Sequence, residues 1–209
     1  VFMSRSHHSE ISAREQILRV VGTQLIFLAL LLVLPVLGLI WPAHLKLVLG
    51  AAALGILTLI LTRKRYLFST DHKIIGVQFL ITSLVMLLVG GLLAMLLRWQ
   101  LAWPGQPLPW MEKLAPAGMP GGIMLPEYYN MLFTMHGSVM IFFAIIPLLV
   151  GVFGNYLIPL KIGAGDMAFP KVNMISYWMV PLSIVIVCAG FFLQGGAAAS
   201  GWTAYAPLS

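Results

Sequence analysis

The chain has 209 residues, of which 60% are hydrophobic and 9% are charged, and its mean hydropathy is +0.98. These values exclude an ordinary soluble domain and indicate an integral membrane protein. The net charge of +6 does not indicate nucleic acid as a partner, because the basic residues lie at the ends of apolar runs, where membrane topology accounts for them.

The N-terminal part of the chain predicts a short tail followed by a helical hairpin. Residues 1–17 read as a tail and residues 18–62 as two membrane helices joined by an interfacial turn. The stretch Ser12–Glu15 has the spacing of a capping box, so we expect the first helix to cover Ala13–Ile40. The segment Leu45–Leu61 is long enough to return across the bilayer.

A basic segment, Arg63–Tyr66, separates this hairpin from a third predicted span, Ile74–Leu97. The residues Ser69–Asp71 offer a helix cap before the span, with a carboxylate that suits the positive end of the helix dipole. Small residues within the span, among them Gly76 and Gly90, allow a second helix or a flat cofactor to approach closely. Helix packing alone also explains them.

Residues 98–127 are rich in Pro, Gly and Trp and predict an extramembrane loop. The fourth span, Met131–Lys161, has His136 close to one end and Asn155 close to the other. A histidine in hydrocarbon is costly unless it faces the protein interior, and neutral imidazole is a common ligand of metals and haem. A histidine bonded to a neighbouring helix is the alternative. With a fifth span at Met174–Leu193, we expect an all-α integral membrane protein with five transmembrane helices.

The basic residues divide unevenly between the two sides of this bundle. If the connections alternate, one side holds nine Lys and Arg residues: Arg5, Arg14, Arg19, Arg63, Lys64, Arg65, Lys73, Lys161 and Lys171. The other side holds three: Lys46, Arg98 and Lys113. Since Lys and Arg favour the cytoplasmic side, the N-terminus is expected in the cytoplasm. His136 then lies near the outer face, whereas Asp166 and Asn173 lie near the inner face, as coupling of redox chemistry to proton movement requires.

Several motifs occur in the order, and at about the spacing, of those in one known family. They are Thr70-Asp-His-Lys-Ile-Ile-Gly76, Thr134-Met-His-Gly137, Gly154-Asn-Tyr-Leu-Ile-Pro159, Ile162-Gly-Ala-Gly-Asp-Met-Ala-Phe-Pro170 and Gly201-Trp-Thr-Ala-Tyr205. Residues 69–209 therefore resemble the N-terminal part of subunit I of the haem-copper oxidases, the family of the cytochrome c oxidases. The hairpin at residues 18–62 lies outside the core of that family.

The resemblance implies roles for five residues. His136 corresponds to an axial ligand of the low-spin haem, whose opposite ligand lies in a later helix. Arg98 corresponds to the arginine that hydrogen-bonds the formyl group in members with haem A; a snorkelling arginine is the alternative. Asp166 corresponds to the carboxylate at the mouth of the proton pathway called the D-channel, with Asn155 and Asn173 as amides just inside it. A simple turn residue is the alternative for Asp166.

The chain also departs from the family pattern. Gly165 stands where the family usually has proline, and Met174 replaces the second asparagine of a common pair. Both changes lie at the channel mouth, so they bear on proton pumping rather than on haem binding.

Four further positions bear on the electron donor. Quinol-oxidising members tend to carry polar residues at the positions of Val89, Leu93, Tyr128 and Met131, which are apolar or aromatic here. The resemblance therefore favours cytochrome c, which delivers electrons through a copper-bearing subunit II. Quinol oxidase subunit I, a nitric oxide reductase relative and a non-catalytic assembly subunit are the alternatives.

The family reduces oxygen to water and couples this reaction to proton translocation. Its high-spin haem and its copper are held by later helices, so the remaining helices are expected from the same chain or from a second one. The expected partners are these helices, subunits II and III, cytochrome c and the lipid bilayer, and we expect the chain to be stable only in such a complex. The expected location is a bacterial cell membrane, with the mitochondrial inner membrane as the alternative.

Overall fold

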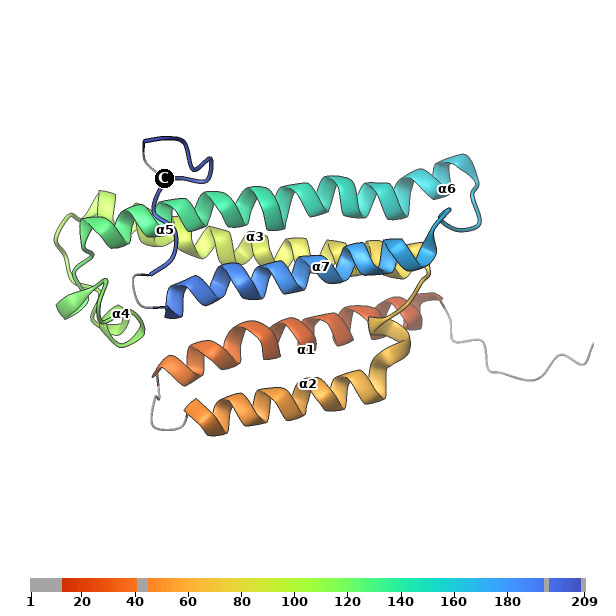
Figure 1. Ribbon diagram of the computed structural model, residues 1–209, viewed down its shortest axis with the longest axis horizontal. Helices are drawn as coiled ribbons and strands as arrows, with labels where there is room; N and C mark the ends of the chain where they lie inside the picture. Colours follow the sequence, from red (N-terminus) through yellow and green to blue (C-terminus); the bar gives the residue numbers. More distant parts are fainter. Residues whose placement is uncertain (1–12, 41–44, 194–195, 208–209) are drawn as a thin grey trace, which may run out of the picture.

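The computed structural model describes residues 13–40, 45–193 and 196–207, and within these residues the regular structure is helical. Five long helical stretches pack together and run in alternating directions (Figure 1). They are α1 (Ala13–Ile40), α2 (Leu45–Leu67), α3 (His72–Ala102), the stretch Pro126–Ile162 and α7 (Pro170–Ala189). The structure confirms the all-α class. The predicted capping residue Ser12 and the predicted turn at residues 41–44 lie outside the described residues.

Four helices among the described residues are long and apolar enough to cross a membrane: Arg14–Leu32, His72–Ala102, Pro126–Ile162 and Pro170–Ala189. The second predicted span, Leu45–Leu61, forms most of α2, which is not among these four. The count of five spans therefore stays a prediction. Helical backbone angles break at Arg63, directly after the predicted end of the hairpin at residue 62.

The α3 helix begins where its cap was predicted. Asp71 accepts a hydrogen bond from the backbone N–H of Lys73 at 2.8 Å, which satisfies one of the free N–H groups at the helix start. At the other end the prediction of a loop from residue 98 was wrong, because α3 continues through Arg98 to Ala102. Within the predicted loop the chain also forms the short helix α4 (Pro109–Leu114) and the 3₁₀ turn η2 (Pro120–Gly122).

The fourth stretch is one continuous helix that contains two π-helical segments. It consists of α5 (Pro126–Ser138), η3 (Val139–Ile145), η4 (Pro147–Leu157) and α6 (Ile158–Ile162). The backbone N–H of Ile146 bonds to the carbonyl of Ile141, and that of Ile158 bonds to the carbonyl of Phe153, each five residues back. Such π-type turns are rare in proteins, and where they occur as single-turn bulges they are often found at functional sites. The run begins five residues before the predicted Met131, since a proline fits the first helical turn.

The α7 helix likewise starts with a proline, four residues before the predicted Met174, and ends in the 3₁₀ turn η5 (Gly190–Phe192). The chain then returns to α5. In residues 196–207, the backbone N–H of Gly201 donates to the Thr134 hydroxyl at 2.9 Å, and that of Ala197 points at the sulfur of Met131 at 3.1 Å. We refer to residues 196–207 as the C-terminal loop.

The two ends of the bundle differ in charge. The starts of α1, α3 and α7, the end of α2 and α6 all lie at one end (Figure 1), and they carry Arg14, Arg19, Arg63, Lys64, Arg65, Lys73, Lys161 and Lys171. The described helices therefore run in alternating directions, as the predicted connections require. Which side of a membrane each end faces stays a prediction.

Candidate functional site

His136 lies in α5 and contacts the neighbouring helix α3. Its Nδ1 atom is 2.9 Å from the backbone carbonyl oxygen of Gly90. A carbonyl oxygen only accepts hydrogen bonds, so Nδ1 carries the proton and the lone pair of the neutral ring is left on Nε2. Histidines that bind metals through one nitrogen usually donate the other N–H in this way, which fixes the tautomer and the ring orientation. The ring of His136 is thus held in the form that can bind iron.

The backbone around His136 is closely packed on two sides. A Cβ atom at Gly90 would lie 2.6 Å from the sulfur of Met140, and one at Gly137 would lie 3.1 Å from Cδ1 of Trp202. Trp202 belongs to the C-terminal loop, which the bond from Gly201 to Thr134 fastens to α5. The quoted motifs around residues 134–137 and 201–205 therefore meet in space beside His136.

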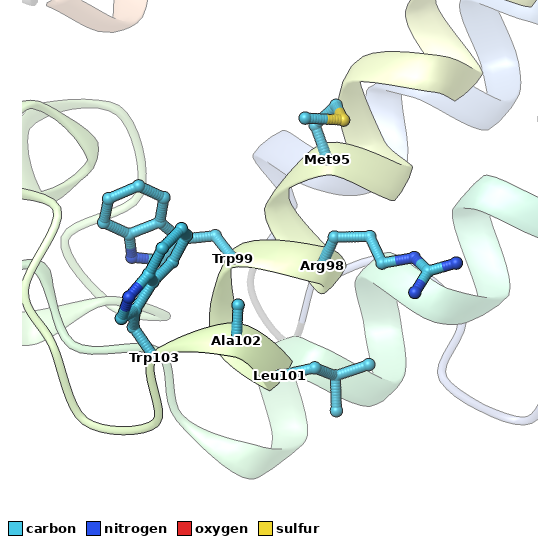
Figure 2. Close-up of a pocket in the computed structure, with 6 residues that line it drawn as sticks. All are labelled: Met95, Arg98, Trp99, Leu101, Ala102 and Trp103. Atoms are coloured by element: carbon cyan, nitrogen blue, oxygen red, sulfur yellow. The ribbon is translucent and has the colours of Figure 1, made fainter.

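Arg98 lies in the last turns of α3, and its side chain is exposed. It lines an open depression of about 360 Å³ together with Met95, Trp99, Leu101, Ala102 and Trp103. Figure 2 shows the guanidinium group directed away from the two tryptophans, on the other side of the helix end. Among the described residues, no hydrogen bond or ion pair engages this group.

The structure does not bring Arg98 into contact with His136. His136 is absent from the residues that line the depression beside Arg98. The carbonyl that holds His136 belongs to Gly90, eight residues earlier on α3. Eight residues of helix correspond to a rise of about 12 Å, which a large planar cofactor, and not a single side chain, would span.

Asp166 lies in the turn between α6 and α7, at the opposite end of the bundle from α4 and the start of α5 (Figure 1). Its carboxylate is exposed and accepts a hydrogen bond from the backbone N–H of Met167 at 2.8 Å. The bond reaches only the next residue along the chain, so it is not the bond to the second residue on that aspartate makes in an Asx-turn. The carboxylate keeps its solvent contact, so the turn geometry and proton collection are compatible.

Asn155 and Asn173 each carry a buried polar atom without a partner among the described residues. Asn155, in η4, is 5% exposed; its amide nitrogen donates to the carbonyl of Gly151 at 2.7 Å, while its Oδ1 is unpaired. In Asn173, in the first turn of α7, the unpaired atom is Nδ2. An unpaired buried polar atom costs about 1–3 kcal/mol, and buried water is the usual remedy. One amide thus offers an acceptor and the other a donor near the Asp166 end.

His72 lies at the start of α3, at the same end of the bundle as Asp166. The sequence predicted no role for it. It is 2% exposed, and its Nδ1 donates to the backbone carbonyl of Asn155 at 2.7 Å. Its place in the motif at residues 70–76 was visible in the sequence, but its partner lies 83 residues away. His72 thus fixes the backbone that carries the Asn155 amide.

Among the described residues, no group of three or more His, Cys, Asp and Glu side chains gathers in the manner of a metal site. His136 is therefore the candidate ligand as a single imidazole.

A family model described as "Cytochrome C and Quinol oxidase polypeptide I" matches residues 74–209. The chain is 42% identical over 144 residues to a protein of Thermostichus vulcanus named "Cytochrome c oxidase subunit 1". It is 45% identical over 145 residues to a protein of Streptomyces coelicolor named "Putative cytochrome c oxidase subunit 1-beta". These matches cover 69% of this chain but only 23% and 22% of the two relatives.

Proposed function

Since the chain belongs to the cytochrome c and quinol oxidase polypeptide I family, we propose that it forms the N-terminal part of subunit I of a respiratory terminal oxidase. In this proposal His136 is an axial ligand of the low-spin haem. The proposal covers a part of the enzyme, because the chain spans less than a quarter of the length of the curated relatives it matches.

The hydrogen bond between His136 and Gly90 is the observation that carries the proposal. It leaves the Nε2 lone pair for iron and orients the ring from a neighbouring helix. When bound, the haem supplies one-electron transfer toward the oxygen-reducing centre. The role of this chain is to present a neutral imidazole in a fixed direction. The second axial ligand belongs, in this proposal, to the helices that follow in the complete subunit.

Arg98 is proposed to contact a substituent at the edge of the haem, with haem A as the type that has a formyl group. Its guanidinium group is not engaged by any described residue, and it lies two turns along the helix that orients His136. Arginine remains charged at any working pH and offers several N–H donors, so it can bond a carbonyl substituent and influence the potential of the haem.

Asp166 is proposed to collect protons at the other end of the bundle, and Asn155 and Asn173 to order water that passes them inward. The exposed carboxylate and the two buried, unpaired amide atoms support this assignment. Amides order water without holding a charge, so they do not trap the proton. These residues would serve the reduction of oxygen to water and the proton translocation coupled to it, which further require the high-spin haem and copper of the complete subunit.

Cytochrome c is the proposed electron donor, acting through a copper-bearing subunit II, with subunit III and the remaining helices of subunit I as further partners. This choice is supported by the four positions at which quinol-oxidising members tend to carry polar residues, because all four are apolar or aromatic in this chain. Met131 is buried and packs its sulfur against the C-terminal loop, and Tyr128 packs beside a buried cluster at the end of α3. The proposed location is a bacterial cell membrane, with the N-terminus in the cytoplasm.

The test is to replace His136 by Ala in the complete oxidase and to record the reduced-minus-oxidised spectrum of the purified complex. We expect the low-spin haem band to disappear, because no neighbouring described histidine can replace the ligand. His72→Leu is the matched control, since it removes a second histidine bonded to a backbone carbonyl at the opposite end. An unchanged spectrum in His136→Ala would show a structural histidine and would favour the non-catalytic subunit.

A further inference from the structure

Helix α1 packs on the face formed by α3 and α7, whereas α2 packs on the far side of α1 and reaches that face mainly near its end (Figure 1). We call these two helices the N-terminal hairpin. They precede residue 74, where the match to the family begins. Their apolar contact includes Phe27 and Leu28 of α1 and Leu67 of α2, which are 4%, 1% and 0% exposed. In a bilayer such contacts alone select no partner, because lipid tails are as apolar as leucine. Polar contacts between the helices therefore decide whether the hairpin is specifically docked.

The first polar contact joins three helices. Gln24 of α1 reaches the hydroxyl of Thr82 on α3 at 3.2 Å and the hydroxyl of Tyr177 on α7. The two hydroxyls are also 3.0 Å apart. All three side chains are buried, with exposed fractions of 1%, 0% and 0%. A buried amide in an apolar environment is costly unless it is hydrogen-bonded, so few other positions of α1 are acceptable.

The second polar contact lies at the end of α2. Gln78 of α3 donates its amide to the backbone carbonyls of Tyr66 and Leu67, at 2.7 and 3.1 Å. Trp178 of α7 donates its indole N–H to the same carbonyl of Leu67 at 3.1 Å. The last carbonyls of a helix have no partner within the helix, and here α3 and α7 supply the donors.

Aromatic rings reinforce both contacts. Trp178 stacks on Phe68 with ring centroids 4.8 Å apart, and it meets Phe27 edge to face at 5.4 Å. One tryptophan of α7 therefore touches α1 and the residue that follows α2. Each helix of the hairpin is thus hydrogen-bonded to both α3 and α7.

We propose that the N-terminal hairpin is a built-in accessory helix pair, docked specifically on the α3–α7 face, with Gln24 as the residue that fixes its register. This face is thereby closed to lipid and to the helices of other subunits. The inference goes beyond the proposed oxidase function and does not depend on the haem or the proton pathway.

The test separates specific docking from mere covalent attachment. A protease site is inserted between Ser69 and Thr70, in the short link between α2 and α3, within the full chain in its purified complex. After cleavage in detergent, size-exclusion chromatography measures how much of the hairpin stays with the remainder. We expect the cleaved hairpin to stay bound, and Gln24→Leu to weaken its retention by about three- to tenfold.

Thr23→Val is the matched control. Thr23 is also buried, at 3% exposed, but its hydroxyl bonds to the carbonyl of Arg19 in its own helix. Its replacement should therefore leave retention unchanged. Release of the hairpin from the unsubstituted chain upon cleavage would overturn the proposal, and so would equal retention of Gln24→Leu and the unsubstituted chain.

A second variant guards against a general folding defect. Gln24→Leu combined with Tyr177→Phe removes both partners of the same hydrogen bond, so the combined loss of retention should be smaller than the sum of the two single losses. If each change lowers retention and the combined loss equals the two single losses, the residues are uncoupled and Gln24 does not fix the register.

Discussion

His136 and His72 join the same two helical stretches at opposite ends of the bundle. Each directs Nδ1 at a backbone carbonyl of the other stretch, that of Gly90 at 2.9 Å and that of Asn155 at 2.7 Å. They differ in access: His72 is 2% exposed, whereas His136 is only partly buried. The hydrogen bond alone therefore does not distinguish a cofactor ligand from a structural histidine. The partial exposure of His136 is the difference that is compatible with a ligand role.

The largest effect on the stability of the complex is expected from His72→Leu. The change leaves the buried carbonyl of Asn155 without its donor, which should lower the stability of the complex by about 1–3 kcal/mol. Thermal inactivation of the purified oxidase measures this loss. Because Asn155 belongs to the proposed proton pathway, proton uptake should also slow.

The spectrum of the same variant sharpens the comparison. The low-spin haem band should remain in His72→Leu and be lost in His136→Ala. Loss of the band in both variants would mean that the two ends are not separable and that either histidine merely holds the fold.

The next effect concerns the Asp166 end alone. Asp166→Asn keeps the size of the side chain and its turn geometry but removes the charge, so we expect proton uptake to slow by roughly tenfold or more. Reduction of the low-spin haem should be largely unchanged, because His136 lies at the other end of the bundle. Stopped-flow measurements with a pH dye and with haem absorbance record the two steps separately.

Glu112→Gln is the control for that experiment. Glu112 is an exposed carboxylate in α4, at the opposite end of the bundle from Asp166. Its neutralisation should leave proton uptake unaltered. Equal uptake and turnover in Asp166→Asn and the unsubstituted enzyme would remove Asp166 from the pathway and leave it as a turn residue.

The middle of each long helix could be predicted from the sequence, because an apolar run of sufficient length indicates a membrane helix by itself. The helix ends were harder to predict. The cap at Asp71 was predicted from its type, but the starts at Pro126 and Pro170 were missed, since those residues precede the apolar runs. The helix through Arg98 was missed because charged and aromatic residues there suggested a loop.

Within the sites, the sequence indicated the residues but not their partners. His136, Asp166 and the two asparagines were singled out as polar groups near apolar runs. Gly90 as the acceptor for His136 and His72 as the donor to Asn155 lie 46 and 83 residues away in the chain. Helical periodicity reports one helix at a time, so contacts between helices are invisible to it. The link from Gln24 to Tyr177, 153 residues apart, was missed for the same reason.

The smallest effect is expected from Arg98→Met, which tests whether the exposed end of α3 belongs to the haem site. The guanidinium group is exposed, so solvent screens it and its influence should stay below about 1 kcal/mol. For a one-electron couple this corresponds to a fall of less than roughly 40 mV in the haem midpoint potential. A shift in the wavelength of the low-spin band should accompany it.

Lys113→Met provides the comparison for Arg98→Met. Lys113 is an exposed cation in α4, at the same end of the bundle, and it does not line the depression beside Arg98. A general loss of positive charge would shift the potential equally in both variants, whereas a direct contact with the haem edge would move the band only in Arg98→Met. If both variants retain the potential and the band of the unsubstituted enzyme, Arg98 is a snorkelling arginine. The haem site then extends along α3 from Gly90 without reaching residue 98.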